Sequence, residues 1–94
     1  MKELTVAERK KLKSEAHHLK PVVQIGRNGI TPALISAVEK ALTDHELIKI
    51  KFQDFKEEKK ILADEISEKT GCAIISMIGN VLTVYRENEE KDKQ

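Results

Sequence analysis

Aromatic side chains are scarce in this sequence: its 94 residues include two Phe, one Tyr and no Trp. Phe52, Phe55 and Tyr85 do not supply the pair of rings with which a sheet face stacks the bases of a nucleic acid. If the chain binds a nucleic acid, recognition must therefore depend on contacts to the nucleic-acid backbone and on shape.

Cysteine and long apolar runs are also nearly missing. Cys72 is the only cysteine, which excludes an internal disulfide and a metal cluster built on cysteines, and its place at the start of an apolar run predicts a core thiol. No apolar run approaches the roughly 20 residues that cross a bilayer, and the first residues do not open a signal peptide. We therefore expect a cytoplasmic protein that does not enter a membrane.

The patterns of catalytic and metal sites are absent too. The serines fall in predicted helices or strands without a Gly-x-Ser-x-Gly elbow, and the scattered histidines lack the spacing of metal ligands. Gly26 and Gly29 have neither the spacing of a P-loop nor the third glycine of a dinucleotide-binding fingerprint. We expect a protein that is not an enzyme, with no catalytic residue, no metal and no cofactor.

Charge is plentiful and unevenly distributed. Residues 1–53 contain ten Lys and Arg and six acids, a net charge of +4, whereas residues 54–94 contain seven and ten, a net charge of −3. The total of +1 hides this asymmetry, which favours a polyanion bound on one side of the protein. The alternative is that the charges only keep a small domain soluble.

Residues 22–32 indicate a buried strand, a turn bracketed by glycines and a helix start in immediate succession. Thr31 is a good N-cap, and Pro32 fits the first helical position. Gly26 and Gly29 allow positive φ and close approach of another backbone, while the planar fork of Arg27 matches phosphate oxygens. This pattern predicts a phosphate-binding turn at a helix N-terminus, although it is equally typical of a tight connection with structural glycines.

Periodicity predicts the elements around this turn. In chain order they are a helix over 6–18, a strand over 22–25, a helix over 32–44, a strand over 47–52, a helix within 54–70 that ends at Gly71, and strands over 72–78 and 81–86. The first two strands should be parallel, and Gly79-Asn80 predicts an antiparallel hairpin for the last two. The order α-β-α-β-α-β-β indicates a two-layer α/β (α+β) domain with one four-stranded mixed sheet.

Side-chain spacing also predicts which faces are buried. We expect the core side of the first helix to be marked by Leu12, Ala16 and Leu19, and that of the third helix by Ile61, Leu62 and Ile66. On the first helix, Arg9 and Lys13 form a basic stripe with His17, and Lys20 lies near its edge. In the second strand, Lys49 and Lys51 alternate with buried positions.

Several separated motifs in this order resemble the YhbY family, the bacterial stand-alone versions of the CRM domain, named for chloroplast RNA splicing and ribosome maturation. They are residues 21–31, residues 45–51, Thr70-Gly71, Ile78-Gly79 and Tyr85-Arg86. The resemblance implies one RNA-binding domain over residues 1–86, similar in fold to the C-terminal domain of translation initiation factor three. It also implies that the last strand lies inside the sheet, antiparallel to its neighbours; residues 87–94 are expected to form a flexible charged tail.

The resemblance further implies an assembly factor for the large ribosomal subunit. Its partners would be large-subunit ribosomal RNA or the precursor of that RNA, within a pre-ribosomal particle, and we expect the protein to be a monomer. The family's Gly-x-x-Gly loop, likened to that of KH domains, falls on Gly26, Arg27, Asn28 and Gly29.

The candidate RNA-binding residues are Gly26, Arg27, Asn28, Gly29 and Thr31 at the turn, with Arg9, Lys13, Lys20, Lys49 and Lys51 around it. A second hypothesis stays open at this point. The chain could be a protein-interaction module in which the sheet or the acidic third helix docks a partner and the glycine turn is structural only.

Overall fold

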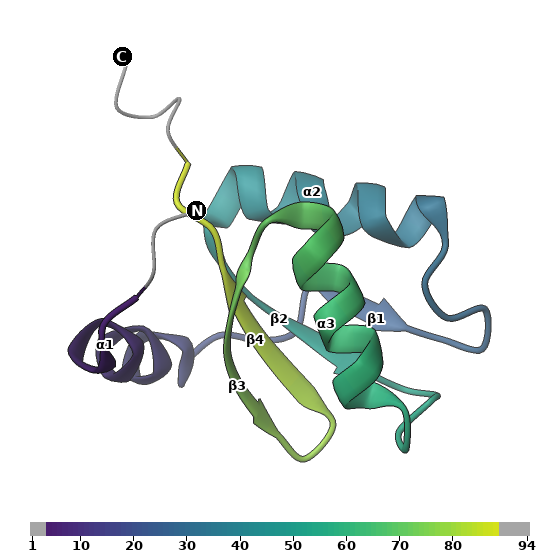
Figure 1. The fold of residues 1–94 in the computed structure, drawn as a ribbon, viewed down its shortest axis with the longest axis horizontal. Coiled ribbons are helices and arrows are strands. Elements are labelled where there is room, and N and C mark those ends of the chain that lie inside the picture. The colour runs from purple at the N-terminus through teal and green to yellow at the C-terminus, as the bar shows by residue number, and fades with distance from the viewer. Residues whose placement is uncertain (1–3, 89–94) are drawn as a thin grey trace.

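The structure, a computed structural model, describes residues 4–88 and contains three helices and four strands in that part of the chain (Figure 1). The elements are α1 (Val6–Ala16), β1 (Val23–Ile25), α2 (Pro32–His45), β2 (Leu47–Phe52), α3 (Lys59–Thr70), β3 (Ala73–Ile78) and β4 (Val81–Tyr85). The predicted α+β class, with one four-stranded mixed sheet, and the predicted element order are confirmed. No helix among these residues is long and apolar enough to cross a membrane.

The four strands form one mixed sheet in the order β1-β2-β4-β3. β1 pairs with β2 in parallel, and β4 pairs with both β2 and β3 in antiparallel fashion. The parallel pair predicted from periodicity is confirmed, and so is the internal position of the last strand that the family resemblance implied. β1 and β3 are therefore the two edges of the sheet.

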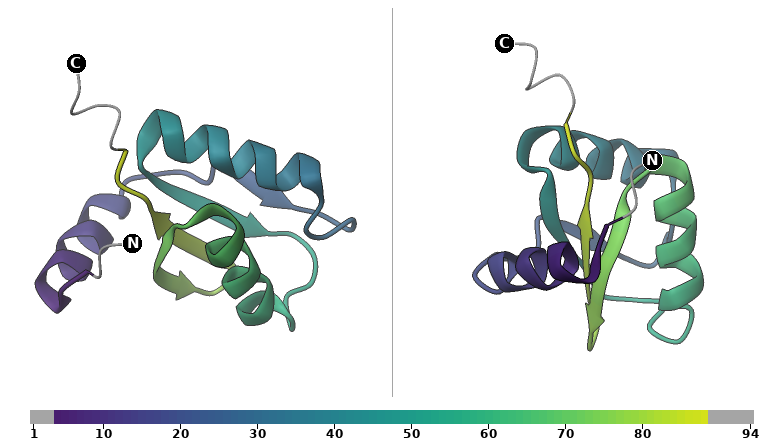
Figure 2. Two further views of the ribbon diagram at one scale, coloured as in Figure 1. Left: turned by 45° about the horizontal axis from the view of Figure 1, so that its top comes forward. Right: turned by 60° about the vertical axis from the view of Figure 1, so that its left-hand side comes forward.

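Helices cover both faces of this sheet, and α1 and α3 lie on opposite sides of the β3–β4 hairpin (Figure 2). The face under α2 and α3 carries the core, to which β2 contributes Ile48, Ile50 and Phe52, none of them more than 2% exposed. Successive side chains of a strand point to opposite faces, so Lys49 and Lys51 project from the other face, as predicted.

Capping interactions define the helix termini, and those at Thr31 and Gly71 are as predicted. The Thr5 hydroxyl accepts a hydrogen bond from the Glu8 backbone N–H, and the Glu8 carboxylate accepts one from the Thr5 N–H, which completes a capping box. Thr31 caps α2, with Pro32 at its start, and Gly71 ends α3 with a φ of 73°. These local signals fix where each helix begins or ends.

Two of the predicted core positions are wrong. Leu19 is 39% exposed, because α1 ends at Ala16 and the chain leaves the helical register before it reaches this residue. Ile61 is 72% exposed, because α3 buries the stripe formed by Ala63, Ile66 and Thr70 and so turns Ile61 outward. Leu62 and Ile66 do contact the core as predicted, so the packing of α3 shifts its buried face away from Ile61 alone.

Two further predictions concern the thiol of Cys72 and the residues after Arg86. The Cys72 thiol is fully buried, as predicted, and burial raises its pKa. Asn88 falls within the predicted tail, yet its backbone N–H donates to the Glu46 carboxylate at 2.7 Å and its side-chain amide donates to the Thr43 carbonyl at 2.8 Å. Residues 89–94 of that predicted tail lie outside the described residues.

Arg86, directly after β4, joins the sheet to both helices of the core layer. Its guanidinium donates to the Glu39 carboxylate and to the Thr43 hydroxyl of α2, the latter at 3.3 Å, and to the Thr70 carbonyl at the end of α3 at 2.8 Å. The Arg86 side chain is only 25% exposed. The bonds to Glu39 and Thr70 are therefore partly shielded from water, unlike an ordinary surface ion pair.

We predict that Arg86→Ala lowers the free energy of unfolding by about 2 kcal/mol, because it leaves the Thr70 carbonyl and the Glu39 carboxylate without this partner. Urea denaturation followed by circular dichroism measures the loss. The control is Lys40→Ala, which removes an exposed ion pair with Asp44 and should cost less than about 0.5 kcal/mol. Equal losses in the two variants would show that the Arg86 contacts do not stabilise the layers.

Candidate nucleic-acid interface

The Gly-x-x-Gly turn is a compact reversal between β1 and α2. The Gly29 backbone N–H donates to the Gly26 carbonyl at 3.0 Å, and Gly29 has a φ of 67°, whereas Gly26 does not adopt a left-handed conformation. Of the two glycines that allow positive φ, only Gly29 adopts it. A Cβ at Gly29 would lie 3.4 Å from Cε2 of Phe55, but a Cβ at Gly26 would meet nothing within 4 Å.

The side chains at the tip of this turn are exposed to solvent. Within residues 4–88, no hydrogen bond or ion pair engages the side chain of Arg27 or Asn28. The first turn of α2 carries no acidic residue, so the partial positive charge of the helix N-terminus is not neutralised there. The Thr31 hydroxyl already accepts a hydrogen bond from the Leu34 backbone N–H at 3.0 Å, so Thr31 is first of all the cap of α2.

Lys49 and Lys51 lie beside β1 on the sheet face opposite the core. Lys51 is the register partner of Gln24, next to the turn, and the Val22 backbone N–H donates to the Lys49 carbonyl at 3.0 Å. Lys20 comes just before β1, at the end of that strand away from the turn. We call Arg27, Lys51, Lys49 and Lys20 the basic track, since the pairing of β1 with β2 sets them in this order along the sheet.

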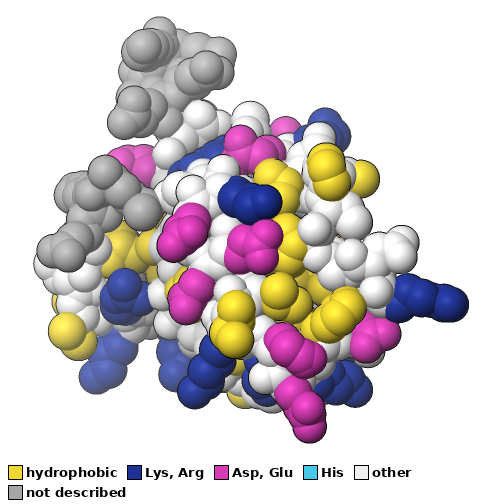
Figure 3. Space-filling view, turned by 45° about the vertical axis from the view of Figure 1, so that its right-hand side comes forward, with side chains coloured by type: hydrophobic (Ala, Val, Ile, Leu, Met, Phe, Trp, Pro, Cys, Tyr) yellow, Lys and Arg dark blue, Asp and Glu magenta, His cyan; other side chains and the backbone are white. Residues whose placement is uncertain are grey.

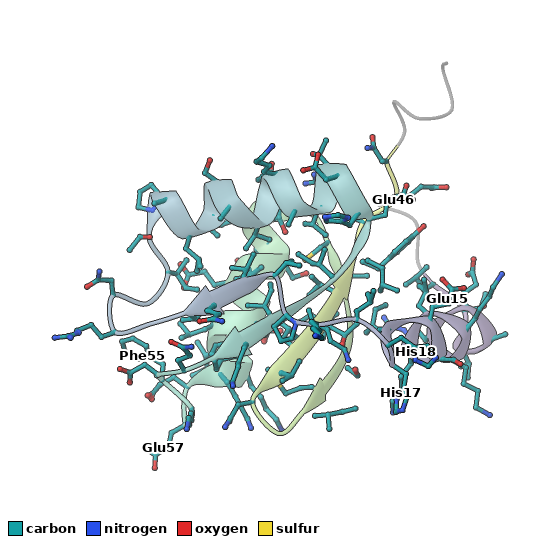
Figure 4. The ribbon with its side chains drawn as sticks, turned by 180° about the vertical axis from the view of Figure 1, so that it is seen from behind. Glu15, His17, His18, Glu46, Phe55 and Glu57 are labelled. Carbon is teal, nitrogen blue, oxygen red and sulfur yellow. The ribbon has the colours of Figure 1, made fainter. Side chains whose placement is uncertain are left out.

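The basic residues of α1 are not brought to the turn. The Arg9 guanidinium donates to the Ile74 carbonyl of β3, and β3 is the sheet edge opposite β1. Figure 4 shows Glu15, His17 and His18 of the α1 region at one end of the molecule and Phe55 at the other, beside the turn. Arg9 thus fastens α1 to the sheet, and Lys13 lies exposed in the last turn of that helix.

Three residues beside the turn were not among the predicted site residues. The Gln53 side-chain amide donates to the Gln24 side chain on the face that carries Lys51, and the Gln53 backbone N–H donates to the Ile25 carbonyl at 3.0 Å. Phe55, with a φ of 56°, places its ring against Gly29. Alternation along β1 could have placed Gln24, but no sequence signal indicates the contact between Phe55 and Gly29.

Only part of the acidic half of the chain faces away from the turn, because Asp54, Glu57 and Glu58 follow Gln53 in the loop beside it. Acidic side chains are interspersed with basic ones over the surface that includes α3 (Figure 3), where the sequence supplies Asp64, Glu65 and Glu68. The two helices of the core layer thus separate this mixed surface from the lysines of β2. Among the described residues, no group of three or more His, Cys, Asp or Glu side chains could hold a metal ion.

Comparison with known proteins gives a consistent assignment. The model of the CRS1/YhbY (CRM) domain matches residues 4–86. A Haemophilus influenzae protein named as an RNA-binding protein is 40% identical over 91 residues, which cover 96% of this chain and 92% of the relative. A Pseudomonas aeruginosa protein named as a probable RNA-binding protein is 37% identical, with 96% and 88% covered.

A solved structure agrees with this assignment. The chain is similar to the solution structure of a hypothetical protein from Staphylococcus aureus for which RNA binding has been proposed, with a TM-score of 0.81 and 35% identity. The alignment covers 97% of this chain and 96% of that one. The family resemblance noted in the sequence is confirmed: this chain belongs to the CRS1/YhbY (CRM) domain family.

Proposed function

We propose that this protein binds RNA through the turn at residues 26–29 and the basic track, and that it is not an enzyme. The observation that carries the proposal is the register of β1 with β2, which sets Lys51 beside the strand that leads directly into the exposed Arg27 turn. RNA binding is also what the names of the relatives describe for those proteins.

The mode of binding follows from the groups that the turn and the track present. Arg27, the N-terminus of α2 and the open space at Gly26 suit a phosphate group that approaches the backbone closely. The lysines of the track then contact phosphates further along the strand. Phosphate contacts position a nucleic acid without reading its sequence, so the affinity should fall linearly with salt on a log–log plot.

We further propose that the RNA is large-subunit ribosomal RNA or its precursor and that the protein acts in the cytoplasm as a monomeric assembly factor on a pre-ribosomal particle. The resemblance of its motifs to YhbY proteins supports this target. Contact through phosphates and shape, with few aromatic side chains, suits a structured RNA better than an unstructured single strand.

We predict that Arg27→Glu combined with Asn28→Asp lowers the affinity for large-subunit ribosomal RNA fragments at least about tenfold, because it places negative charge where phosphate binds. Filter binding or fluorescence anisotropy across a salt series measures the affinity, and circular dichroism checks the fold. The control is Lys60→Glu with Ser36→Asp, which makes the same change in net charge at exposed positions of α3 and α2.

Comparison with the control variant shows whether a loss of RNA affinity is specific to the turn. Loss in the turn variant alone supports the turn as a phosphate site, whereas equal loss in both variants would mean that only the net charge matters. A folded wild-type protein that binds none of these RNAs at low salt would contradict the proposal and favour the protein-interaction module.

We predict opposite outcomes for alanine at the two glycines of the turn. Gly26→Ala should leave stability unchanged or slightly higher, because its Cβ has free space and no left-handed φ, yet weaken RNA binding several-fold by keeping phosphate away from the backbone. Gly29→Ala should lower the free energy of unfolding by about 1–2 kcal/mol, because of its φ of 67°. Urea unfolding and RNA titration measure both effects, and wild-type RNA affinity in Gly26→Ala would contradict this role of Gly26.

A further inference from the structure

A groove lies between the end of α1 and the starts of β1 and β2, at the end of the sheet away from the turn. Its volume is about 480 Å³, within the range of pockets that hold small ligands. Its apolar lining comes from Leu19, Val22, Leu47 and Ile48, and its polar lining comes from Glu15, Lys20 and His45. The groove does not include the turn at residues 26–29, and the core residue Ile48 borders it.

Two of the apolar side chains that line the groove are exposed to solvent. Leu19 is 39% exposed and Val22 is 54% exposed, and both border the groove. Exposed apolar side chains that gather in a concave site mark a place where a flat apolar group can be buried. The face of a nucleobase is such a group, and an unpaired base can leave its stack to enter a protein pocket.

The polar lining restricts which base fits. Glu15 is acidic, and within residues 4–88 no hydrogen bond or ion pair engages its carboxylate. An ionised carboxylate only accepts hydrogen bonds, and it can accept two in parallel. Guanine presents two adjacent donors, N1–H and the N2 amino group, whereas adenine, cytosine and uracil do not present such a pair.

The groove is continuous with the basic track. Lys20 belongs to both, and Val22, in the groove wall, donates its backbone N–H to the Lys49 carbonyl. From Val22 to Gly26 the chain is extended, so the groove and the turn are about 13 Å apart along β1. An RNA strand whose phosphates follow the track therefore passes over the groove, with the Lys20 ammonium beside its backbone.

We infer that this groove binds an unpaired guanine of an RNA held on the basic track, with the Glu15 carboxylate accepting hydrogen bonds from N1–H and the N2 amino group. This inference rests on the proposed RNA binding and adds to it a site for base recognition. The aliphatic walls contact the faces of the base, and Lys20 contacts the adjoining phosphate.

The experiment compares RNA hairpin oligonucleotides whose unpaired loop is rich in uridine and carries one guanosine, one inosine or one adenosine at the same position. Inosine lacks the N2 amino group, and adenosine lacks both donors of the guanine pair. For the wild-type protein we expect guanosine to bind about tenfold more tightly than adenosine, with inosine between them. Fluorescence anisotropy measures the three affinities at one salt concentration.

The Glu15→Gln variant tests whether the Glu15 carboxylate recognises the guanine base. Glutamine offers one acceptor and one donor in nearly the same shape, so the preference for guanosine over adenosine should fall to less than about twofold. The control is Glu68→Gln on α3, which changes the net charge equally at an exposed position and should keep the wild-type preference. Both changes strengthen non-specific binding alike, so the ratio of affinities isolates base recognition.

The outcomes separate this inference from the proposed function. If the wild-type protein binds the three oligonucleotides equally, or if Glu15→Gln keeps the full guanosine preference, the inference is wrong although RNA binding stands. If the folded wild-type protein binds none of them and no ribosomal RNA fragment at low salt, the proposed function itself fails.

Discussion

The alternation of side chains along β2 is the constraint on which the rest of the structure depends. Ile48, Ile50 and Phe52 point into the core, and this fixes Lys49 and Lys51 on the opposite face. A shift of one residue in the register would bury two ammonium groups and expose three large apolar side chains. The hydrophobic core and the basic surface are thus two results of a single register.

The position of the turn at residues 26–29 also depends on β2. β1 has only three residues and lies at the edge of the sheet, so its place depends on its parallel pairing with β2. Beyond β2, the backbone N–H groups of Gln53 and Asp54 both donate to the Ile25 carbonyl, and the ring of Phe55 packs against Gly29. A turn held from both sides is preorganised, and it loses little conformational entropy when it binds a ligand.

Much of the fold could be predicted from the sequence because the relevant signals are local. The capping box at Thr5, the Thr31-Pro32 start of α2, the alternation in β2 and the Gly79-Asn80 hairpin each act over a few residues. The place of β4 between β2 and β3 is not local, and only the family resemblance implied it. The exposure of Ile61 was missed because burial in α3 depends on how that helix packs against the sheet.

Only part of the candidate site could be predicted from the sequence. Residues 26–31 are contiguous, and β-strand periodicity alone places Lys49 and Lys51 on one face. The contact of Arg9 with the Ile74 carbonyl and that of Phe55 with Gly29 join segments that are far apart in the chain, so no spacing rule could reveal them. The groove at Glu15 likewise exists only because α1 ends where β1 and β2 begin.

The central claim is that RNA binds the face that carries Lys49 and Lys51 and the turn next to it. Amide chemical-shift mapping of the isotope-labelled protein during titration with a large-subunit ribosomal RNA fragment tests this claim most directly. The account predicts the largest changes at residues 26–29, 49 and 51, with residues 60–68 of α3 unaffected. Changes confined to α3 or to the β3 edge would contradict it and would place the binding surface away from the turn and from Lys49 and Lys51.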